Sequence, residues 1–289
     1  MTMDIGLDSV VSADGTTISY RQLGSGPGLV IVHGGMCASQ HYLRLAEMLA
    51  DKYMVYVPDR RGRGMSGPAG NDYGMEKEIE DLAALLQKTG ARYIFGHSSG
   101  GLITLEAALR LPIRKIAVYE PAVSINGSVP TAWYPKFERA LRKKNPAAAI
   151  ALVIKGLRVS SKLNFVPTWA LACLMRLAQR EEEGRELAKL VYTFPLDMSL
   201  VRAQESTYQK YRDIRTDTLL LGGNKSPAYL LDAVRIIAET VPAAKIATLP
   251  GLDHGAPNND PGQLISDELK QFFGRQEVRV WNGEASTTT

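Results

Sequence analysis

The stretch YIFGHSSGGL, residues 93–102, decides how this sequence folds. Its centre, Gly96-His97-Ser98-Ser99-Gly100, fits the pattern G-x-S-x-G. The apolar run 93–95 comes before it and a helical run, 101–111, follows, so the segment predicts a strand, a sharp turn and a helix. Glycines permit such a turn, and the backbone strain at the serine holds its hydroxyl away from the chain. We therefore expect Ser98 to act as a nucleophile above the edge of a sheet.

A second pair of glycines follows an earlier apolar run. The strand predicted at 28–32 leads directly into the segment HGGM, residues 33–36. Small residues let backbone N–H groups come close to a ligand, and the helix that follows the serine directs its first N–H groups to the same centre. We expect the N–H groups of Ser99 and Gly35 to form an oxyanion hole, with Met36 as the alternative to Gly35.

A serine hydroxyl needs a general base, and the chain has four histidines. His254 lies in the segment LPGLDHGAP, residues 249–257, which follows the last predicted core strand. A loop at this end of a strand can bring an imidazole to the serine, so we assign His254 as the base. His97 is expected to point away from the serine, His33 to hold its own loop by hydrogen bonds, and His41 to have a surface role.

The sequence alternates short apolar runs with amphipathic ones, which predicts a mainly parallel sheet with helices on both faces. From about 124 to 211 this alternation stops, and helical stretches separated by prolines replace it. We expect this part to pack over the carboxyl edge of the sheet, and the polar tail 281–289 to be frayed. Strands are predicted at 9–11, 17–20, 28–32, 53–57, 93–95, 116–118, 218–221 and 245–249, and helices at 42–50, 77–89, 101–111, 135–143, 147–157, 169–180, 185–192, 229–239 and 263–273.

In order and spacing these features resemble the α/β-hydrolase superfamily over nearly the whole chain. The segment PDRRGRGMSG, residues 58–67, looks like the P-D-x-R-G-x-G-x-S loop of that superfamily, in which Asp59, Arg61 and Ser66 have structural roles. The resemblance implies the α/β-hydrolase fold, with a helical cap inserted into the core. It divides the chain into a first part of the core at 1–122, a helical cap at 123–213 and a second part of the core at 214–289.

The acid of the expected triad departs from the usual pattern of the superfamily. Most members carry an aspartate in a G-x-x-D loop after the penultimate core strand, but Ser226 stands at that position here. Glu120 ends the strand after the serine's helix, where some members, including haloalkane dehalogenases, place their acid, and it keeps the chain order Ser–Glu–His. We assign Glu120 as the acid, and Asp253 and Asp232 remain alternatives.

The residue at the sharp turn also narrows the chemistry. Members of this fold that open epoxides or remove halogens use aspartate there, whereas a serine indicates acyl transfer. We therefore predict a serine hydrolase that cleaves a carboxylic ester, thioester or lactone through an acyl-enzyme on Ser98. Two alternatives remain open: a lyase or carbon–carbon bond hydrolase with the same triad, and a ligand-binding or receptor protein with little turnover.

The predicted cap is both apolar and basic. Its aromatic and apolar residues Trp133, Tyr134, Trp169 and Met175 are expected to bind an apolar or amphiphilic acyl substrate. Residues 123–213 carry 15 Lys and Arg against 8 Asp and Glu, a net charge of +7, in a chain whose net charge is +4. This excess indicates either a solvated basic surface or attraction of an anionic substrate or acidic partner.

Composition argues against several other classes of protein, among them membrane-spanning and disulfide-rich proteins. The 289 residues are 45% apolar and 22% charged, which is typical of a soluble globular protein with a sizeable core. We see no signal peptide and no run near the roughly 20 apolar residues of a membrane span, so a cytoplasmic location is expected. The two cysteines, Cys37 and Cys173, are expected to be free thiols. No metal, cofactor or nucleic acid is expected, and the oligomeric state is left open.

Overall fold

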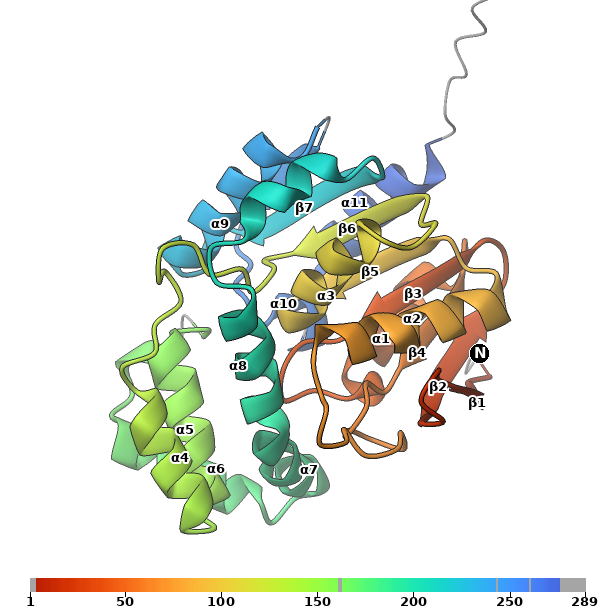
Figure 1. Ribbon diagram of the computed structural model, residues 1–289. Coiled ribbons are helices and arrows are strands. Elements are labelled where there is room, and N and C mark those ends of the chain that lie inside the picture. The colour runs from red at the N-terminus through yellow and green to blue at the C-terminus, as the bar shows by residue number, and fades with distance from the viewer. Residues whose placement is uncertain (1–3, 161–162, 243, 260, 276–289) are drawn as a thin grey trace, which may run out of the picture.

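The computed structural model describes residues 4–160, 163–242, 244–259 and 261–275, and their strands form one twisted sheet (Figure 1). Within these residues the strand order is β1-β2-β4-β3-β5-β6-β7-β8. β1 and β2 form an antiparallel hairpin, β2 also pairs antiparallel with β4, and all pairs from β4 to β8 are parallel. The strands are β1 (Gly6–Val11), β2 (Thr17–Gly24), β3 (Gly28–Val32), β4 (Met54–Pro58), β5 (Tyr93–His97), β6 (Lys115–Tyr119), β7 (Asp217–Gly223) and β8 (Lys245–Leu249).

Helices cover both faces of this sheet, as the alternating sequence pattern predicts. β3, β5 and β6 are almost entirely buried because they lie in the middle of the sheet between the two helical layers. One apolar cluster lies under α2, α3 and α9, and a second lies under α1 and α11. These helices are α1 (Leu43–Leu49), α2 (Met75–Thr89), α3 (Ser99–Ala108), α9 (Ala228–Thr240) and α11 (Gly262–Gly274); the shorter η1 (Ser39–Tyr42) and α10 (Ala256–Asn259) lie in connecting loops.

The central strands end at the same edge of the sheet. Val32 pairs with Gly96, Gly96 with Val118, and Tyr119 with Leu221. The carboxyl ends of parallel strands meet at one edge, where proteins with such sheets bind their ligands. The loops after β3, β5, β6, β7 and β8 therefore converge there.

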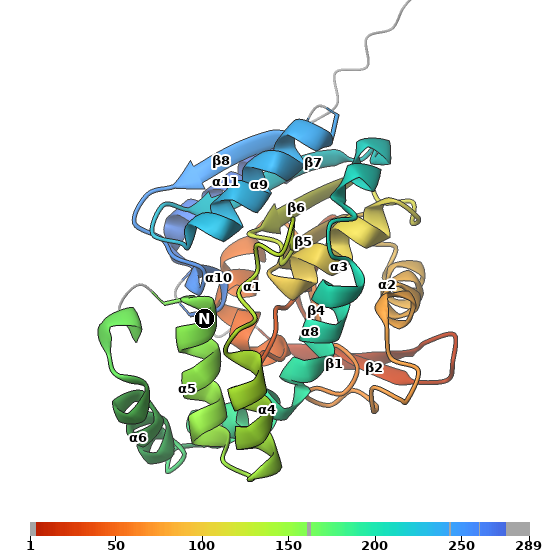
Figure 2. The ribbon, with the colours of Figure 1, turned by 60° about the vertical axis from the view of Figure 1, so that its left-hand side comes forward.

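A helical insertion, which comprises α4 to α8, separates β6 from β7. Figures 1 and 2 show α4, α5 and α6 standing together beside the sheet, while α8 lies closer to it and contacts α3. The boundaries of core and cap at residues 123 and 213 remain predictions. The insertion contains α4 (Tyr134–Arg142), α5 (Pro146–Leu157), η2 (Leu163–Phe165), α6 (Thr168–Ala178), α7 (Glu182–Leu190), η3 (Val191–Thr193), α8 (Phe194–Ala203) and η4 (Tyr208–Asp213).

One helix of the insertion, α8, is absent from the sequence-based prediction. Pro195 looked like a break between helices, but it occupies the first turn of α8. Proline is tolerated there because the backbone N–H groups of a helix's first turn have no partner within the helix. The polar tail predicted at 281–289 lies outside the described residues. Among the described helices, none is both long and apolar enough to cross a membrane.

Candidate active site

Ser98 lies at a strained turn between β5 and α3, with φ of 54° and ψ of −120°. A side chain is sterically excluded two residues before and two residues after it. A Cβ atom at Gly96 would lie 2.2 Å from Thr104 Oγ1, and one at Gly100 would lie 2.2 Å from the carbonyl oxygen of Val32. The close packing of this turn against α3 and β3 therefore requires both glycines of the motif.

The structure brings Ser98, His254 and Glu120 together in one hydrogen-bonded chain. Ser98 Oγ lies 3.1 Å from His254 Nε2, and His254 Nδ1 lies 2.7 Å from Glu120 Oε2. Glu120 is fully buried at the end of β6, and its Oε1 accepts the N–H of Gly223 at 2.7 Å. An ionised carboxylate only accepts hydrogen bonds, so Nδ1 donates to it. The neutral imidazole then has an unprotonated Nε2 that accepts the Ser98 hydroxyl.

The other acidic candidates lie elsewhere. Asp232 faces the surface of α9 and pairs with Arg235 at 3.1 Å. Asp253 lines the cavity above the serine, but the ring nitrogen Nδ1 of His254 is hydrogen-bonded to the glutamate. Ser226, at the usual aspartate position, has a buried Oγ without a hydrogen-bond partner among the described residues. Of the three carboxylates considered from sequence, Glu120 is the one in contact with the imidazole.

The predicted oxyanion-hole residues also lie around Ser98. Ser99 is the first residue of α3, so its backbone N–H has no acceptor within the helix. Gly35 and Met36 follow β3, and Met36 has a positive φ of 55°. All three line the same cavity as Ser98. Their assignment to an oxyanion hole remains a prediction that this arrangement supports.

His97 connects the loop after β3 to the loop that carries His254. Burial, and then the charge of His254, holds the pKa of His97 well below its ordinary value, so its ring is neutral. Its Nε2 lies 2.8 Å from the His254 carbonyl oxygen and must donate to it. Its Nδ1 therefore accepts the Tyr42 hydroxyl at 2.5 Å, and the Tyr42 oxygen accepts the N–H of Gly34 at 3.1 Å. Both nitrogens of His97 are thus engaged away from the serine.

The other two histidines, His33 and His41, form hydrogen bonds with backbone groups of nearby loops. His33 is buried, donates from Nδ1 to the carbonyl oxygen of Gly34 at 2.8 Å and accepts the N–H of Arg60 at Nε2. Burial, and then the charge of Arg60, holds the pKa of His33 well below its ordinary value. His41, half-buried, accepts the N–H of Ala38 at 3.0 Å. His33 therefore braces its loop, as the sequence led us to expect.

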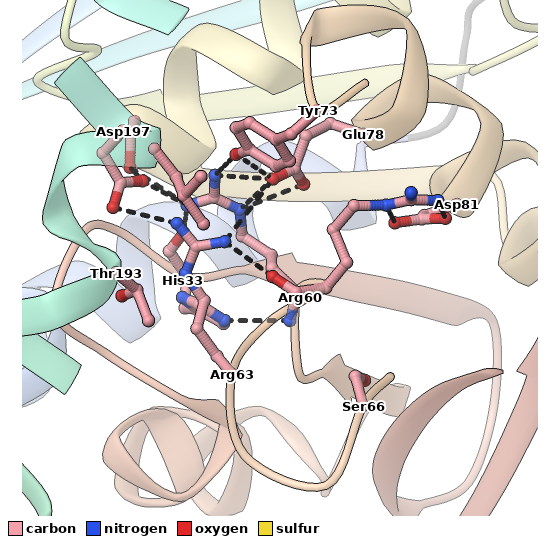
Figure 3. Close-up of polar contacts among 12 residues, drawn as sticks. His33, Arg60, Arg63, Ser66, Tyr73, Glu78, Asp81, Thr193 and Asp197 are labelled. Carbon is pink, nitrogen blue, oxygen red and sulfur yellow. Dashed lines mark hydrogen bonds and ion pairs between the residues drawn. The ribbon is translucent and has the colours of Figure 1, made fainter. Parts of the chain in front are cut away.

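A buried carboxylate that sequence analysis did not identify, Asp197, contacts the residue after Ser98 and two arginines, which Figure 3 shows beside it. Asp197, on α8, accepts hydrogen bonds at Oδ1 from Arg60 and from Ser99 Oγ, both at 2.8 Å, and at Oδ2 from Arg63 at 2.9 Å. Burial alone would raise the pKa of Asp197, but the charges of Arg63 and Arg60 hold it well below its ordinary value. Asp197 is therefore ionised and joins the helical insertion to the turn that carries the serine.

The same arginines are neutralised from the other side by α2. Glu78 is buried and accepts from Arg60 at 2.7 Å, and Tyr73 donates its hydroxyl to Glu78 at 2.6 Å. Arg63 Nη1 lies 3.7 Å from Glu78, so both carboxylates face both guanidinium groups. This arrangement balances two buried positive charges with two buried negative charges, as such burial requires. Figure 3 shows Asp197 and Glu78 on opposite sides of the arginines.

One signal in the sequence could have indicated this cluster. Arg60 and Arg63 occupy the two variable positions of the P-D-x-R-G-x-G segment, and a buried arginine needs an acidic partner. Asp197 lies 134 residues beyond Arg63, in a helix that the sequence pattern did not reveal. The pairing was therefore not predictable from sequence spacing.

A cavity of about 300 Å³ lies above Ser98, between the sheet edge and the helical insertion. Its wall is mainly apolar. Among the described residues that line it there is no Lys or Arg, and the acidic ones are Asp197 and Asp253. The apolar lining residues include Met36, Ile150, Val153, Ile154, Leu157, Leu163, Leu187, Phe194, Met198 and Val201.

The four residues expected to bind substrate are not among the described residues that line this cavity. Trp133 and Tyr134 are buried in the apolar cluster inside the insertion, and Met175 packs against that cluster. Trp169 is 73% exposed on α6. This part of the prediction disagrees with the structure because the insertion turns α5, and not its aromatic residues on α4 and α6, toward Ser98.

Cys37 lines the cavity as a buried thiol. Burial, and then the charge of Asp197, raises the pKa of the Cys37 thiol to about 12, so this residue packs as an uncharged side chain. Cys37 and Cys173 are both free, as expected. The described residues contain no group of three or more His, Cys, Asp or Glu that could hold a metal ion.

Comparison with known proteins gives consistent matches. The model of a family described as "Alpha/beta hydrolase family" matches residues 29–268. The crystal structure of an alpha/beta hydrolase from Sphaerobacter thermophilus superposes with a TM-score of 0.76 at 30% identity, covering 92% of this chain and all of that one. An esterase from Rhodococcus sp. ECU1013 superposes with a TM-score of 0.61 at 24% identity, covering 92% of this chain and 98% of that one, which is a likeness of fold.

A curated relative shares part of the sequence. The uncharacterized hydrolase YraK of Bacillus subtilis is 35% identical over 116 residues, which are 39% of this chain and 42% of that protein. The chain spans less than half of the length of the first curated relatives it matches.

Proposed function

The chain belongs to the alpha/beta hydrolase family and is an enzyme, and on this premise we propose that it cleaves carboxylic esters or related acyl bonds through an acyl-enzyme on Ser98. His254 takes the proton of Ser98 as its oxygen attacks the carbonyl carbon. The N–H groups of Ser99 and Gly35 hold the resulting oxyanion, with Met36 as the alternative to Gly35. His254 then passes the proton to the leaving alcohol or thiol. A water molecule, deprotonated by the same imidazole, releases the acid and restores the serine.

The observation that carries this proposal is the hydrogen-bonded chain from Glu120 through His254 to Ser98. Its distances of 2.7 and 3.1 Å are within reach of proton transfer. The buried carboxylate orients the imidazole so that Nε2 faces the serine, and it stabilises the imidazolium that forms during attack. A glutamate after β6 thereby takes the role that the family usually gives to the residue at position 226.

The cavity supports an uncharged, apolar acyl group as the substrate. Its wall consists mainly of aliphatic side chains, and its described lining contains no Lys or Arg, so a carboxylate or phosphate would be buried there without a cationic partner. The basic excess of the insertion lies outside the described lining of the cavity. We therefore assign the substrate to neutral esters, thioesters or lactones with an apolar acyl part, and not to anionic acyl groups.

A fluorophosphonate probe tests this proposal directly. It should label the wild-type protein on Ser98, identified by mass spectrometry, and p-nitrophenyl butyrate should be hydrolysed. Ser98→Ala should lose both labelling and turnover. Ser226→Ala, which removes another buried hydroxyl of the same type, should keep both. A wild-type protein that is neither labelled nor active on a panel of neutral esters would argue against acyl-enzyme chemistry and favour the ligand-binding alternative. A protein that is labelled on Ser98 but hydrolyses no ester would favour carbon–carbon bond chemistry with the same triad.

A further inference from the structure

The outer part of the helical insertion is strongly basic. Residues 139–180, which contain the end of α4 and all of α5, η2 and α6, include nine Lys and Arg and no Asp or Glu. We call this part the outer lobe. Seven of the nine are exposed to solvent: Arg139, Arg142, Lys143, Lys144, Arg158, Arg176 and Arg180. A run of this length without one acidic residue leaves the lobe's positive charge uncompensated from within.

The same lobe exposes a row of large apolar side chains. Phe165 is 90% exposed, Trp169 is 73% exposed and Leu177 is 54% exposed. Trp169, Cys173 and Leu177 lie four residues apart and therefore share one face of α6. Leu171 is fully buried, so the opposite face is the one that packs onto the protein. The exposed face of α6 is thus apolar, with arginines at its carboxyl end.

The short helix η2 lies between the cavity and this apolar face along the chain. Figure 2 shows α5 between α4 and α6, and η2 comes before α6 in the chain. Leu163, in η2, lines the cavity above the serine, whereas Phe165, two residues further, points into solvent. One short segment therefore contributes both to the cavity wall and to the exposed apolar surface.

We propose that the outer lobe docks onto an anionic lipid bilayer, with Phe165, Trp169 and Leu177 in the headgroup region. Helices that lie in a bilayer interface combine an apolar face with flanking Lys and Arg, and aromatic residues favour this depth. A second copy of the chain would fit less well, because a two-fold contact between outer lobes would bring exposed Lys and Arg against the same Lys and Arg of the other copy. A negatively charged lipid surface instead attracts each Lys or Arg near it by about 1 kcal/mol.

Cosedimentation with vesicles tests the proposal on the full chain. Vesicles with 30 mol% phosphatidylglycerol in phosphatidylcholine should bind the protein at least about tenfold more strongly than pure phosphatidylcholine vesicles at low salt. Raising the salt to 0.5 M should remove most of this difference, because exposed charges are then screened. Equal binding to both vesicle types, or no binding to either, would overturn the proposal.

Variants separate the contribution of the exposed apolar side chains to vesicle binding from that of the arginines. Phe165→Ser with Leu177→Ser should lower vesicle binding at least about tenfold, whereas Leu264→Ser, on α11 and 44% exposed, should not. Arg176→Gln with Arg180→Gln should also weaken binding, unlike Arg44→Gln on α1. Activity on a water-soluble ester should stay unchanged in all of them. Ser98→Ala should bind vesicles like the wild type, so the proposal does not depend on hydrolysis.

Cys173 provides a reporter on the docking face itself. It is exposed on α6 while Cys37 is buried, so an environment-sensitive maleimide dye can be attached to Cys173 in the native protein. Its emission should shift to the blue when anionic vesicles are added. A shift that depends on protein concentration in the absence of lipid, together with dimers in sedimentation velocity, would instead identify a second copy as the occupant and refute docking to lipid.

Discussion

At the residue scale, the proposed triad has a glutamate, Glu120, where most members of the family have an aspartate. Glu120 follows β6 with a positive φ of 43°. Its side chain is one methylene longer than that of aspartate, and it reaches His254 from the end of β6, the strand next to β7. The N–H of Gly223, on β7, fixes its second oxygen. The end of β7 therefore contributes a backbone N–H to Glu120, whereas in most members of the family the loop after this strand carries the acid.

Replacing Glu120 tests this assignment. Glu120→Gln keeps the shape but cannot stabilise an imidazolium, so we expect kcat for p-nitrophenyl butyrate to fall about 10²- to 10⁴-fold, and Ser98→Ala to lower it at least about 10³-fold. Asp232→Asn, a carboxylate on the surface of α9, is the control and should leave kcat within about twofold. If Asp253→Asn lowers kcat and Glu120→Gln does not, the acid is Asp253.

At the scale of elements, α8 links the helical insertion to the nucleophile. Asp197 accepts a hydrogen bond from the hydroxyl of Ser99. In the proposed mechanism the backbone N–H of Ser99 donates to the oxyanion. A Cβ atom on Gly35 would lie 3.1 Å from Asp197 Oδ2, so the same carboxylate lies against the second oxyanion loop. We therefore expect Asp197 to position Ser99 for catalysis while it packs against Gly35.

Removing this link should affect catalysis more than substrate binding. Asp197→Asn leaves Arg60 and Arg63 with one buried partner, and breaking such a pair costs about 3–5 kcal/mol of unfolding free energy. Ser99→Ala is milder, because it removes the hydrogen bond to Asp197 and keeps the backbone N–H. We expect Ser99→Ala to lower kcat about tenfold with little change in KM. A change confined to KM would contradict the positioning role.

At the scale of the whole molecule, the sheet edge and the insertion enclose a site with several buried ionisable groups. His33 and His97 stay neutral because burial lowers the pKa of each from 6.5. Glu78 shows the opposite balance: burial would raise its pKa, but the charge of Arg60 brings it below its ordinary value. Each of these groups makes the folded state sensitive to acid, in two different pH ranges.

Stability should therefore fall in two steps as pH decreases. Below pH of about 6.5 the unfolded chain binds protons at His33 and His97 while the folded chain does not, which lowers the unfolding free energy by up to about 1.4 kcal/mol per pH unit for each histidine. The depressed pKa of Glu78 and Asp197 adds a second loss below pH of about 4. Urea unfolding between pH 8 and 5 measures the first step, and constant stability over that range would contradict it.

Local patterns in the sequence determined the sheet, most helices, and the turn at Ser98. A strand or helix is indicated by the pattern of residues that are neighbours in sequence. The G-x-S-x-G motif is also local, although its glycines are required by packing against α3 and β3. Because parallel strands end at one edge, the sequence also indicated that Ser98, Glu120 and His254 would share that edge. The choice of the acid partner among the candidates depended on distances that sequence spacing does not contain.

Only the tertiary structure revealed Asp197 and the wall of the cavity. Asp197 meets the arginines of the 58–67 segment across more than a hundred residues, through a helix whose first turn contains a proline. Which face of α5 lines the cavity, and which face of α6 meets solvent, depends on how the helices pack, because their sequences are apolar on more than one side. The sequence thus indicated the elements and the candidate triad, while packing between distant elements decided the surroundings of Ser98, because those contacts join segments whose spacing along the chain carries no signal.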